Sequence, residues 1–371
     1  MKFLRFLLFP FAIIYGTLVF LRNKFYDWHL FPSSRFEIPI ILVGNISTGG
    51  TGKSPHIEYL IRLLKPNFKV ATLSRGYGRK TKGYILAKQD SSSEEIGDEP
   101  KQFKNKFEDI LVAVDSDRAN GIKQLLSHQP DLGVVLLDDA FQHRALTASL
   151  SIVLTDYNKL FSTDLILPVG NLREFRSGVS RAAIIIVTKC PENLSQIKRN
   201  ELQKTLIRNQ TQKVLFSYIQ YGSLVNLFDS VNGNNNPVLD STCDVLLLTG
   251  IATTQPLEDY VKGKSKSVLH LKYSDHHSFS KNDLNDVIKK FNTIASANKI
   301  ILTTEKDAMR LMSREFKQIL MPLPVCYLPI GPCFRRSRRG LSFPPISGIT
   351  GTRCSTACAR CLTTLKPAVT P

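Results

Sequence analysis

The sequence predicts a doubly wound α/β fold. Two observations carry this prediction: short apolar segments recur along the chain, and segments able to form helices separate them. The apolar segments are "IPIILV", "KVATLS", "DILVAV", "GVVLLD", "LSIVLT" and "AAIIIVT". Each is rich in valine or isoleucine and apolar at nearly every position, which is typical of parallel strands buried on both faces.

Two domains are expected. Residues 36–228 hold the six apolar segments and predict the first domain. Its first helix is predicted after Pro55, where apolar residues at positions 57, 60, 61 and 64 form one stripe. The Asn- and Gly-rich segment 230–242 predicts a linker or long turn. Residues 240–330 show further strand and helix signals, including a capping-box pair, Ser280 and Asp283, and predict a second, smaller α/β domain.

Residues 1–30 form a separate N-terminal segment. Its residues 6–21 are uncharged and mostly apolar, and basic residues flank them on both sides. A full membrane span needs about 20 apolar residues, so this segment is short for one. Basic flanks and interspersed aromatic residues predict a helix that lies in the bilayer interface. A full span, or a helix that only covers a core groove, remains an alternative.

The formal net charge of the 371-residue chain is +18. Such a charge predicts anionic partners, which could be nucleic acid, acidic phospholipid or a phosphorylated substrate. Only Cys190 and Cys243 precede residue 300, and two scattered cysteines predict free thiols in a reducing compartment.

The segment "GNISTGGTGKSP", residues 44–55, follows the first predicted strand and precedes the first predicted helix. Its end fits the phosphate-binding pattern G-x-x-x-x-G-K-[ST], the P-loop, although Ser47 stands where the first glycine should be. Backbone N–H groups would face phosphate oxygens, Lys53 would bridge the β- and γ-phosphates, and Ser54 would bind Mg²⁺. The predicted nucleotide-binding residues are Ser47, Thr48, Gly49, Gly50, Thr51, Gly52, Lys53 and Ser54. A glycine-rich turn without a ligand is the alternative.

A P-loop needs a second acidic group for Mg²⁺, and the segment "GVVLLDDAFQHR" offers one. Its apolar strand ends in Asp138 and Asp139. Open α/β sheets bind ligands at the carboxyl ends of their strands, so these carboxylates would lie beside the P-loop. A solvated acidic turn is the alternative. His143 follows closely, either to contact phosphate or as an ordinary turn residue.

Four further loops carry residues suited to phosphoryl transfer. In "SRGYGRKTKGY", Arg75 and its basic neighbours suit an anion, although a nucleic-acid loop would look similar. "EEIGDEP" supplies Asp98 and Glu99, either of which could be the base that a kinase needs, and a solvated acidic loop is the other interpretation. "LPVGNLREF" adds Arg173. "YSDHHSF" adds His276, for which metal binding, acid/base chemistry and a capping turn stay open.

In this order, the motifs "GNISTGGTGKSP", "SRGYGR", "GDEP", "DDAFQHR", "LPVGNLRE", "DHHSF" and "TTEKDA" resemble the tetraacyldisaccharide 4′-kinase family. They span roughly residues 38–310, and Ser47 in the P-loop is typical of the family too. The resemblance implies ATP-dependent phosphorylation of the 4′-hydroxyl of a tetraacyldisaccharide 1-phosphate, a lipid A precursor in lipopolysaccharide biosynthesis. It also implies a P-loop NTPase-type domain, a smaller α/β domain and an N-terminal membrane-contacting helix.

The resemblance further implies roles for single residues. Asp98 matches the family's proposed general base, and His276 matches its partner. Asp138 and Asp139 match the Mg²⁺-associated pair, and Glu99 is a further candidate for the metal or phosphate network. The residues that match positions near phosphate are Gln142, His143 and Arg173.

The implied cofactors are ATP and Mg²⁺, and the implied partners are an acylated disaccharide 1-phosphate and the membrane surface. The implied location is the cytoplasmic face of the inner membrane, as a peripheral protein. No nucleic acid and no obligate protein partner are expected. The alternative is a membrane-anchored P-loop nucleotide switch, or an ATPase without a lipid substrate, but neither explains "GDEP" or "DHHSF".

Residues 332–371 form an atypical tail. They contain seven Lys or Arg, no Asp or Glu, and no helix or strand period. The spacing of Cys354, Cys358 and Cys361 is one used to hold iron–sulfur clusters, but its usual context is absent. We interpret the tail as the product of a shifted reading frame and expect it to be disordered.

Overall fold

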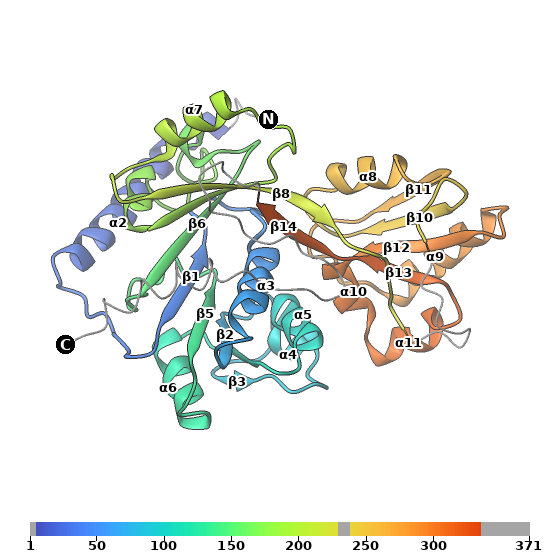
Figure 1. Cartoon of the computed structure of the whole chain (residues 1–371), viewed down its shortest axis with the longest axis horizontal. Helices are drawn as coiled ribbons and strands as arrows, with labels where there is room; N and C mark the ends of the chain where they lie inside the picture. The colour runs from blue at the N-terminus through green and yellow to red at the C-terminus, as the bar shows by residue number, and fades with distance from the viewer. Residues whose placement is uncertain (1–4, 229–237, 335–371) are drawn as a thin grey trace.

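The computed structural model describes residues 5–228 and 238–334, which form two α/β units side by side (Figure 1). The larger unit has a nine-stranded sheet with the order β14-β8-β7-β6-β1-β5-β2-β4-β3. Its strands are β1 (Ile40–Gly44), β2 (Val70–Ser74), β3 (Ile85–Leu86), β4 (Leu111–Val114), β5 (Val134–Asp138), β6 (Leu150–Asp156), β7 (Ile184–Thr188), β8 (Lys213–Tyr221) and β14 (Ile330–Phe334). All pairs are parallel except those of β3 and β14, the edge strands.

Helices cover both faces of this sheet, which confirms the doubly wound α/β fold. They are α3 (Lys53–Leu64), α4 (Ser93–Ile96), α5 (Asp98–Lys106), α6 (Arg118–His128) and α7 (Gln196–Leu206), with the 3-10 helices η1 (Phe161–Thr163) and η2 (Arg176–Arg181). Side chains of β1 alternate between the faces, so Val43 belongs to the same core cluster as Ile57 of α3. Its neighbour Leu42 belongs to the opposite cluster with Ile122 of α6.

Strand β1 lies in the middle of the larger sheet, between β5 and β6. The chain leaves this position toward both sides of the sheet. The carboxyl end of β1 is therefore a topological switch point, the place where open α/β sheets bind their ligands. Residues 44–55, the predicted P-loop, follow β1 directly and lead into α3.

The smaller unit has a five-stranded sheet with the order β11-β10-β12-β13-β9. Its elements are β9 (Val225–Asn226), β10 (Asp244–Thr249), α8 (Gln255–Lys262), β11 (Ser267–Lys272), α9 (Lys281–Thr293), β12 (Lys299–Thr304), α10 (Glu305–Leu311), α11 (Arg314–Leu320) and β13 (Val325–Leu328). Helix α8 packs on one face, and α9, α10 and α11 pack on the other. The capping box predicted at Ser280 and Asp283 is present at the start of α9.

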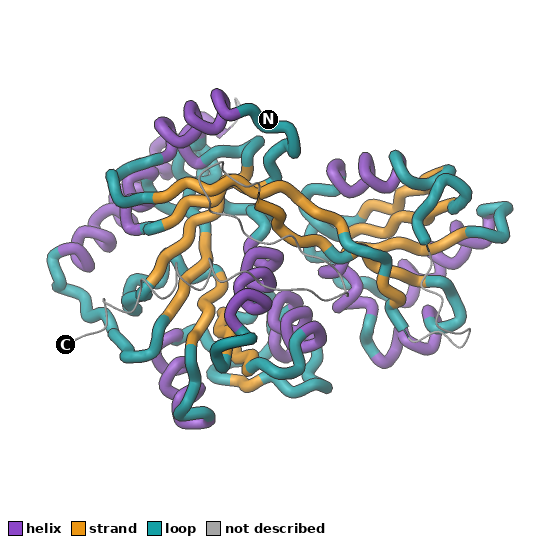
Figure 2. Tube along the Cα trace, viewed as in Figure 1, coloured by secondary structure: helices purple, strands orange, loops and turns teal. Residues whose placement is uncertain are grey.

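Two neighbouring strands join the units, and this changes two predicted boundaries. The chain passes from β8 into β9 and returns from β13 into β14, which pairs antiparallel with β8 (Figure 2). Val225–Asn226, predicted in the first domain, therefore belong to the second sheet. Pro332–Phe334, predicted in the atypical tail, complete β14 and rejoin the first sheet, because Phe334 pairs with Ser217. The rest of the predicted tail lies outside the described residues.

Helix α2 (Phe9–Asp27) lies along the larger unit (Figure 1). Its small residues Ala12 and Gly16 face the protein, and a Cβ atom at Gly16 would come within 2.9 Å of the ring of Phe175. The exposed apolar residues of the helix and the turn before it are Phe6, Leu7, Leu8, Phe9, Phe11, Ile13, Ile14, Leu18, Phe20 and Leu21. In the described part of the chain, no helix combines the length and the apolar character needed to cross a membrane.

Candidate active site

The P-loop between β1 and α3 has the backbone that a phosphate cradle needs. Gly49 and Gly52 have φ angles of +104° and +86°, which favour glycine. A Cβ atom at Gly49 or Gly50 would meet no heavy atom within 4 Å, so the space above the loop is open. The loop also ends at the N-terminus of α3, where free N–H groups and the helix dipole attract anions.

Neighbouring segments hold the P-loop in place. The N–H of Thr48 donates to the carbonyl of Asn171 at 2.8 Å, and the N–H of Arg173 donates to the carbonyl of Ile46 at 2.7 Å. On the other side, Lys189 Nζ donates to the carbonyl of Gly50 at 2.5 Å and pairs with Asp156 at 2.8 Å. These contacts hold the loop from both sides.

The predicted acidic pair lies beside the P-loop, at the end of β5. Lys53 Nζ is 3.6 Å from Asp139 Oδ1, and Arg173 donates to both oxygens of Asp139 at 3.0 and 3.1 Å. Asp138 is 5% exposed, and its Oδ1 has no hydrogen-bond partner. Burial raises the pKa of Asp138 to about 7, although the nearby charge of Lys53 opposes this shift.

This donor set fits Mg²⁺ bound together with a nucleotide. A buried carboxylate oxygen without a partner is what a cation can satisfy. In the described residues, no cluster of three or more His, Cys, Asp or Glu side chains could hold a metal alone. Mg²⁺ commonly binds through one or two carboxylates plus substrate phosphates, so Asp138 near an occupied P-loop suits it.

Asp98 and His276 come from different units and meet at one place. Asp98 begins α5, and His276 lies in the turn after β11. Arg310 of α10 donates Nε to Asp98 Oδ2 at 2.8 Å, and its Nη2 lies 2.7 Å from the same oxygen. His276 Nδ1 is 3.7 Å from that oxygen, longer than a hydrogen bond. Asp98 Oδ1 has no hydrogen-bond partner among the described residues and remains able to accept a proton.

The charges around Asp98 favour its ionised form. Burial would raise the pKa of Asp98, but the nearby polar groups of His276 and Arg310, with further charge from Lys306, outweigh burial, so the pKa lies below the usual range. Lys306 Nζ lies 3.1 Å from His276 Nε2. Arg310 Nη2 lies 3.4 Å from His276 Nδ1, so both ring nitrogens of His276 face side chains that can only donate.

Two glycines let the loops around this pair approach closely. Gly97 precedes Asp98 with φ +93°, and a Cβ atom there would lie 3.2 Å from the backbone of Gly76. This contact brings the "SRGYGR" and "GDEP" loops together. It also places Tyr77 edge-on to His276, with 5.3 Å between ring centroids. His276 itself has φ +58°, an uncommon backbone conformation for a residue other than glycine.

The other predicted residues take several positions. Glu99 pairs with Lys306 at 2.8 Å and also adds negative charge near Asp138. Gln142 donates to the carbonyl of Asn45 and to Glu174, both at 2.9 Å, so it supports the start of the P-loop. Ser47 is buried in a bridge with Leu172.

His143 and Arg75 lie in the loops after β5 and β2. His143 is half-buried, its Nε2 has no partner, and burial lowers its pKa, so the ring is neutral. Arg75 is exposed, with no hydrogen bond or ion pair in the described residues. Both lie near Arg118, which is 3% exposed.

Sequence reasoning missed several residues of the site. Arg118 sits near Asp138 with an unpartnered Nε, and burial lowers its pKa to about 10, so it stays charged. Glu174, in contrast, stands in the predicted "LPVGNLREF" loop, and it is buried and held by Arg181 at 2.7 Å. Arg310 is three residues beyond Asp307 in the "TTEKDA" region, and only this proximity to a quoted motif could have indicated it.

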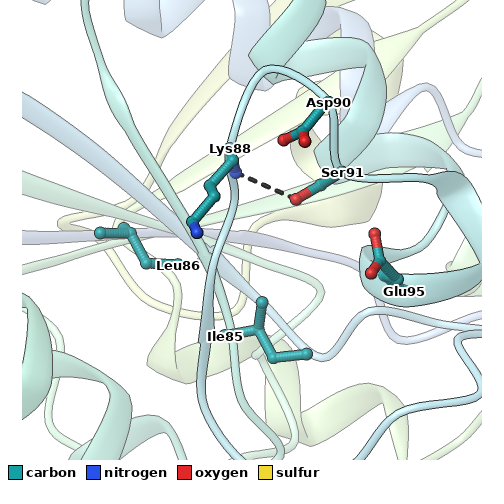
Figure 3. A pocket seen from close by; sticks show the side chains of 6 residues that line it. All are labelled: Ile85, Leu86, Lys88, Asp90, Ser91 and Glu95. Atoms are coloured by element: carbon teal, nitrogen blue, oxygen red, sulfur yellow. Dashed lines mark hydrogen bonds between the residues drawn. The ribbon is translucent and has the colours of Figure 1, made fainter.

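A pocket of about 310 Å³ opens elsewhere, beside β3 and α4 (Figure 3). Its lining residues are Ile85, Leu86, Lys88, Asp90, Ser91 and Glu95. Inside it, the N–H of Lys88 donates to Ser91 Oγ at 3.0 Å. None of the P-loop, acidic-pair or Asp98 residues lines this pocket, so it is separate from the site.

The fold and the site define a P-loop phosphotransferase: an open phosphate cradle, an acidic pair beside it, and a carboxylate–histidine pair where the two units meet. The family described as "Tetraacyldisaccharide-1-P 4'-kinase" matches residues 4–340. The chain belongs to this family. The match extends beyond the last of the quoted motifs, which end near residue 310.

Relatives and a solved structure agree with this assignment. A tetraacyldisaccharide 4'-kinase of Flavobacterium johnsoniae is 46% identical over 325 residues, covering 88% of this chain and 93% of the relative. One of Bacteroides thetaiotaomicron is 44% identical over 331 residues, covering 86% and 87%. The crystal structure of "apo" form LpxK from Aquifex aeolicus in complex with ATP is similar with a TM-score of 0.70, 25% identity and 99% coverage of both chains.

Proposed function

We infer that this chain transfers the γ-phosphate of ATP to the 4′-hydroxyl of a tetraacyldisaccharide 1-phosphate, the lipid A precursor on which its family acts. The observation that carries this inference is the meeting of Asp98 and His276, from two domains, next to an open P-loop. A nucleotide switch needs the P-loop but has no use for a base held at the contact between the two domains. A kinase needs both, because the acceptor hydroxyl must lose a proton as it attacks.

Asp98 Oδ1 is the atom that would accept the hydroxyl proton. Arg310 occupies Oδ2 and orients the carboxylate, and Nδ1 of His276 lies on the same side, 3.7 Å from Oδ2. Lys53 and the N–H groups of residues 49–53 would hold the β- and γ-phosphates. The Arg173 side chain is partly exposed, so a phosphate group could compete with Asp139 for its guanidinium. Arg75, exposed and unpaired, is available to an anionic group of either substrate.

Mg²⁺ is proposed as the cation of this site, held by Asp138 with Ser54 and the phosphates, and with Asp139 nearby. When bound, it neutralises charge on the transferred phosphate. Glu99 is engaged by Lys306 in this structure, so it would act on the cation only through its charge.

The assignment of Asp138 predicts a pH-dependent cation affinity. Its raised pKa of about 7 means that below this pH a proton must leave when the cation binds. The dissociation constant of Mn²⁺, as a probe with a non-hydrolysable ATP analogue, should rise roughly tenfold per pH unit below pH 7 and stay flat above it. Asp138→Asn should weaken binding and remove this dependence.

Electron paramagnetic resonance of free Mn²⁺ measures these affinities without any turnover. Asp131→Asn is the control, because Asp131 is exposed and pairs with Lys69 far from the P-loop. An Asp138→Asn variant with the affinity and pH profile of the unaltered chain would remove Asp138 from the cation site.

A membrane surface is the proposed location of catalysis, on the cytoplasmic face of the inner membrane as a peripheral protein. Helix α2 presents its exposed apolar residues next to the loops of the site. Tyr15 donates to the carbonyl of Arg173 at 2.8 Å, and Arg22 donates to the carbonyl of Gln142 at 3.0 Å. An acyl chain is costly to remove from a bilayer, at about 0.8 kcal/mol per CH₂, so a site beside an interfacial helix suits a lipid acceptor.

This location predicts a large effect of charge on α2. Phe11 and Ile14 are 61% and 59% exposed, so Phe11→Glu with Ile14→Glu should leave the fold intact. Losing their burial in lipid should cost about 3 kcal/mol, on the order of a hundredfold in affinity for anionic phospholipid vesicles. Co-sedimentation with the vesicles measures the loss.

The control places the same charges on apolar residues outside α2. Phe68 and Ile197 are exposed residues of the loop before β2 and of α7. Phe68→Glu with Ile197→Glu should bind vesicles as the unaltered chain does. Equal binding by both double variants would contradict an interfacial role for α2.

A further inference from the structure

The two units contact each other through α5 and α10, which pack side by side (Figure 1). At one end of this contact, Asp98 and Glu99 of α5 pair with Arg310 and Lys306 of α10. At the other end lies a second group of charges that neither the P-loop nor the acceptor chemistry uses. It consists of Glu58, Lys106 and Glu305, here called the lysine bridge.

Lys106 is the centre of the lysine bridge. Its Nζ lies 2.6 Å from Glu58 Oε2 and also contacts Glu305 Oε1. Glu58 belongs to α3, the helix that begins at the P-loop, and Glu305 is the first residue of α10. One side chain of α5 therefore joins the P-loop helix of the first domain to α10 of the second.

The two carboxylates depend on this lysine. The side chains of Glu58 and Glu305 are 1% and 6% exposed, and that of Lys106 is 21% exposed. Glu58 has two further partners, Gln102 at 2.7 Å and Arg62 at 3.4 Å. Glu305 has none, since its Oε2 is buried without a hydrogen bond. A buried charge needs a close partner. Without Lys106, Glu305 at the start of α10 would lose its only contact with a cation among the described residues.

The position of α10 matters to the site because its next residues reach it. Lys306 follows Glu305 directly and contacts both Glu99 and His276. Arg310 is about one turn further and orients Asp98. A shift of α10 away from α5 would withdraw both cations from the proposed base and its partner. The nucleotide cradle, built from β1 and α3, would keep its own contacts.

We propose that Lys106 is a positioning residue, which holds α10 against the P-loop helix and thereby aligns Asp98 and His276 with the γ-phosphate. The proposal rests on the roles given to Asp98 and His276 above. In this proposal the lysine bridge fixes the position of the second domain relative to the first. If Lys106 only stabilised the fold, its replacement would lower the free energy of unfolding, but it would not lower kcat while leaving the affinity for ATP unchanged.

The test compares Lys106→Met with Lys104→Met in the full chain. Lys104 lies on the same helix and bonds only to carbonyls of Glu108 and Ile110. We expect Lys106→Met to lower kcat at least tenfold while the dissociation constant for ATP changes less than threefold. Lys106→Arg should restore most of kcat, and Lys104→Met should change neither quantity. Unchanged kcat in folded Lys106→Met, or a parallel loss of ATP affinity, would overturn the proposal.

A second variant covers the case in which Lys106→Met does not fold. Glu305→Leu removes the anchor on α10 and leaves the Lys106–Glu58 pair intact, so it carries less risk to the first domain. It should show the same loss of kcat with ATP affinity preserved, and a wild-type kcat would overturn the proposal.

Amide hydrogen exchange tests the role of Lys106 independently of the proposed kinase activity. In Lys106→Met or Glu305→Leu, amides of α10 should exchange at least tenfold faster, while those of α9 should not change. This readout needs no lipid substrate, so a chain that failed to phosphorylate the lipid would still test the bridge. Unchanged exchange in α10 would contradict it.

Discussion

Asp98→Asn should lower phosphoryl transfer by about three orders of magnitude and leave ATP binding unchanged. A positioned general base contributes roughly 10²–10⁴-fold to rate, and an amide cannot accept the proton. Asparagine keeps the size of the side chain and can still accept a hydrogen bond from Arg310. The P-loop belongs to other elements, so nucleotide affinity should not move. Steady-state kinetics and calorimetric titration with ATP measure the two quantities.

Asp109→Asn is the matched control for this change. Asp109 lies just after α5, is exposed, and among the described residues pairs only with Lys65. Its variant should keep full activity. If Asp98→Asn kept more than about a tenth of the rate, another group would have to be the base, and Glu99 would be the first candidate.

Lys53→Met should lower the affinity for ATP on the order of tenfold and should lower turnover at least a hundredfold. Lys53 begins α3, its side chain is 17% exposed, and its ammonium lies 3.6 Å from Asp139 at the open cradle. A P-loop lysine acts on the β- and γ-phosphates in the ground state and more strongly as charge moves in the transition state. Titration with ATP and single-turnover kinetics separate the two effects.

Lys65→Met, just after the far end of α3, is the control for Lys53. Lys65 bonds to Asp109 at the surface and should be replaceable without effect on either quantity. An unchanged ATP affinity in Lys53→Met would mean that phosphate is held elsewhere, and would remove the P-loop from its proposed role.

Local patterns in the sequence were sufficient for much of the fold. The six apolar segments of the first domain are strands, because side chains buried on both faces leave a continuous apolar run. The Ser280–Asp283 capping box was predicted because its donors and acceptors are three residues apart. The cradle at Gly49 and Gly52 was predicted for the same reason, since a P-loop is a local structure.

Contacts between distant segments could not be predicted in this way. Asp98 and Arg310 are 212 residues apart, and no local pattern states that α10 packs on α5. The resemblance to a kinase family paired Asp98 with His276, but the intervening role of Lys306 and Arg310 needed the structure. His277, beside His276, instead contacts Asp283 at the start of α9, at 3.1 Å. Which histidine faces Asp98 depends on the backbone of that turn, where His276 has φ +58°.

The return of the chain to the first sheet was also hidden. β14 completes an edge of the larger sheet by pairing with β8, more than a hundred residues earlier. Its residues include Pro332, which an edge strand tolerates and a central parallel strand does not. β14 follows the second domain in the sequence but pairs in the sheet of the first domain. The composition of such a strand does not indicate which sheet it joins.

The most direct test of the central claim is transfer of labelled γ-phosphate from ATP to a tetraacyldisaccharide 1-phosphate in mixed micelles, with the position of the new phosphate determined by nuclear magnetic resonance. We expect the unaltered chain to add one phosphate at the 4′-hydroxyl, and Asp98→Asn to do so about a thousandfold more slowly. Release of phosphate to water, with the lipid unchanged, would contradict it and favour an ATPase or a nucleotide switch.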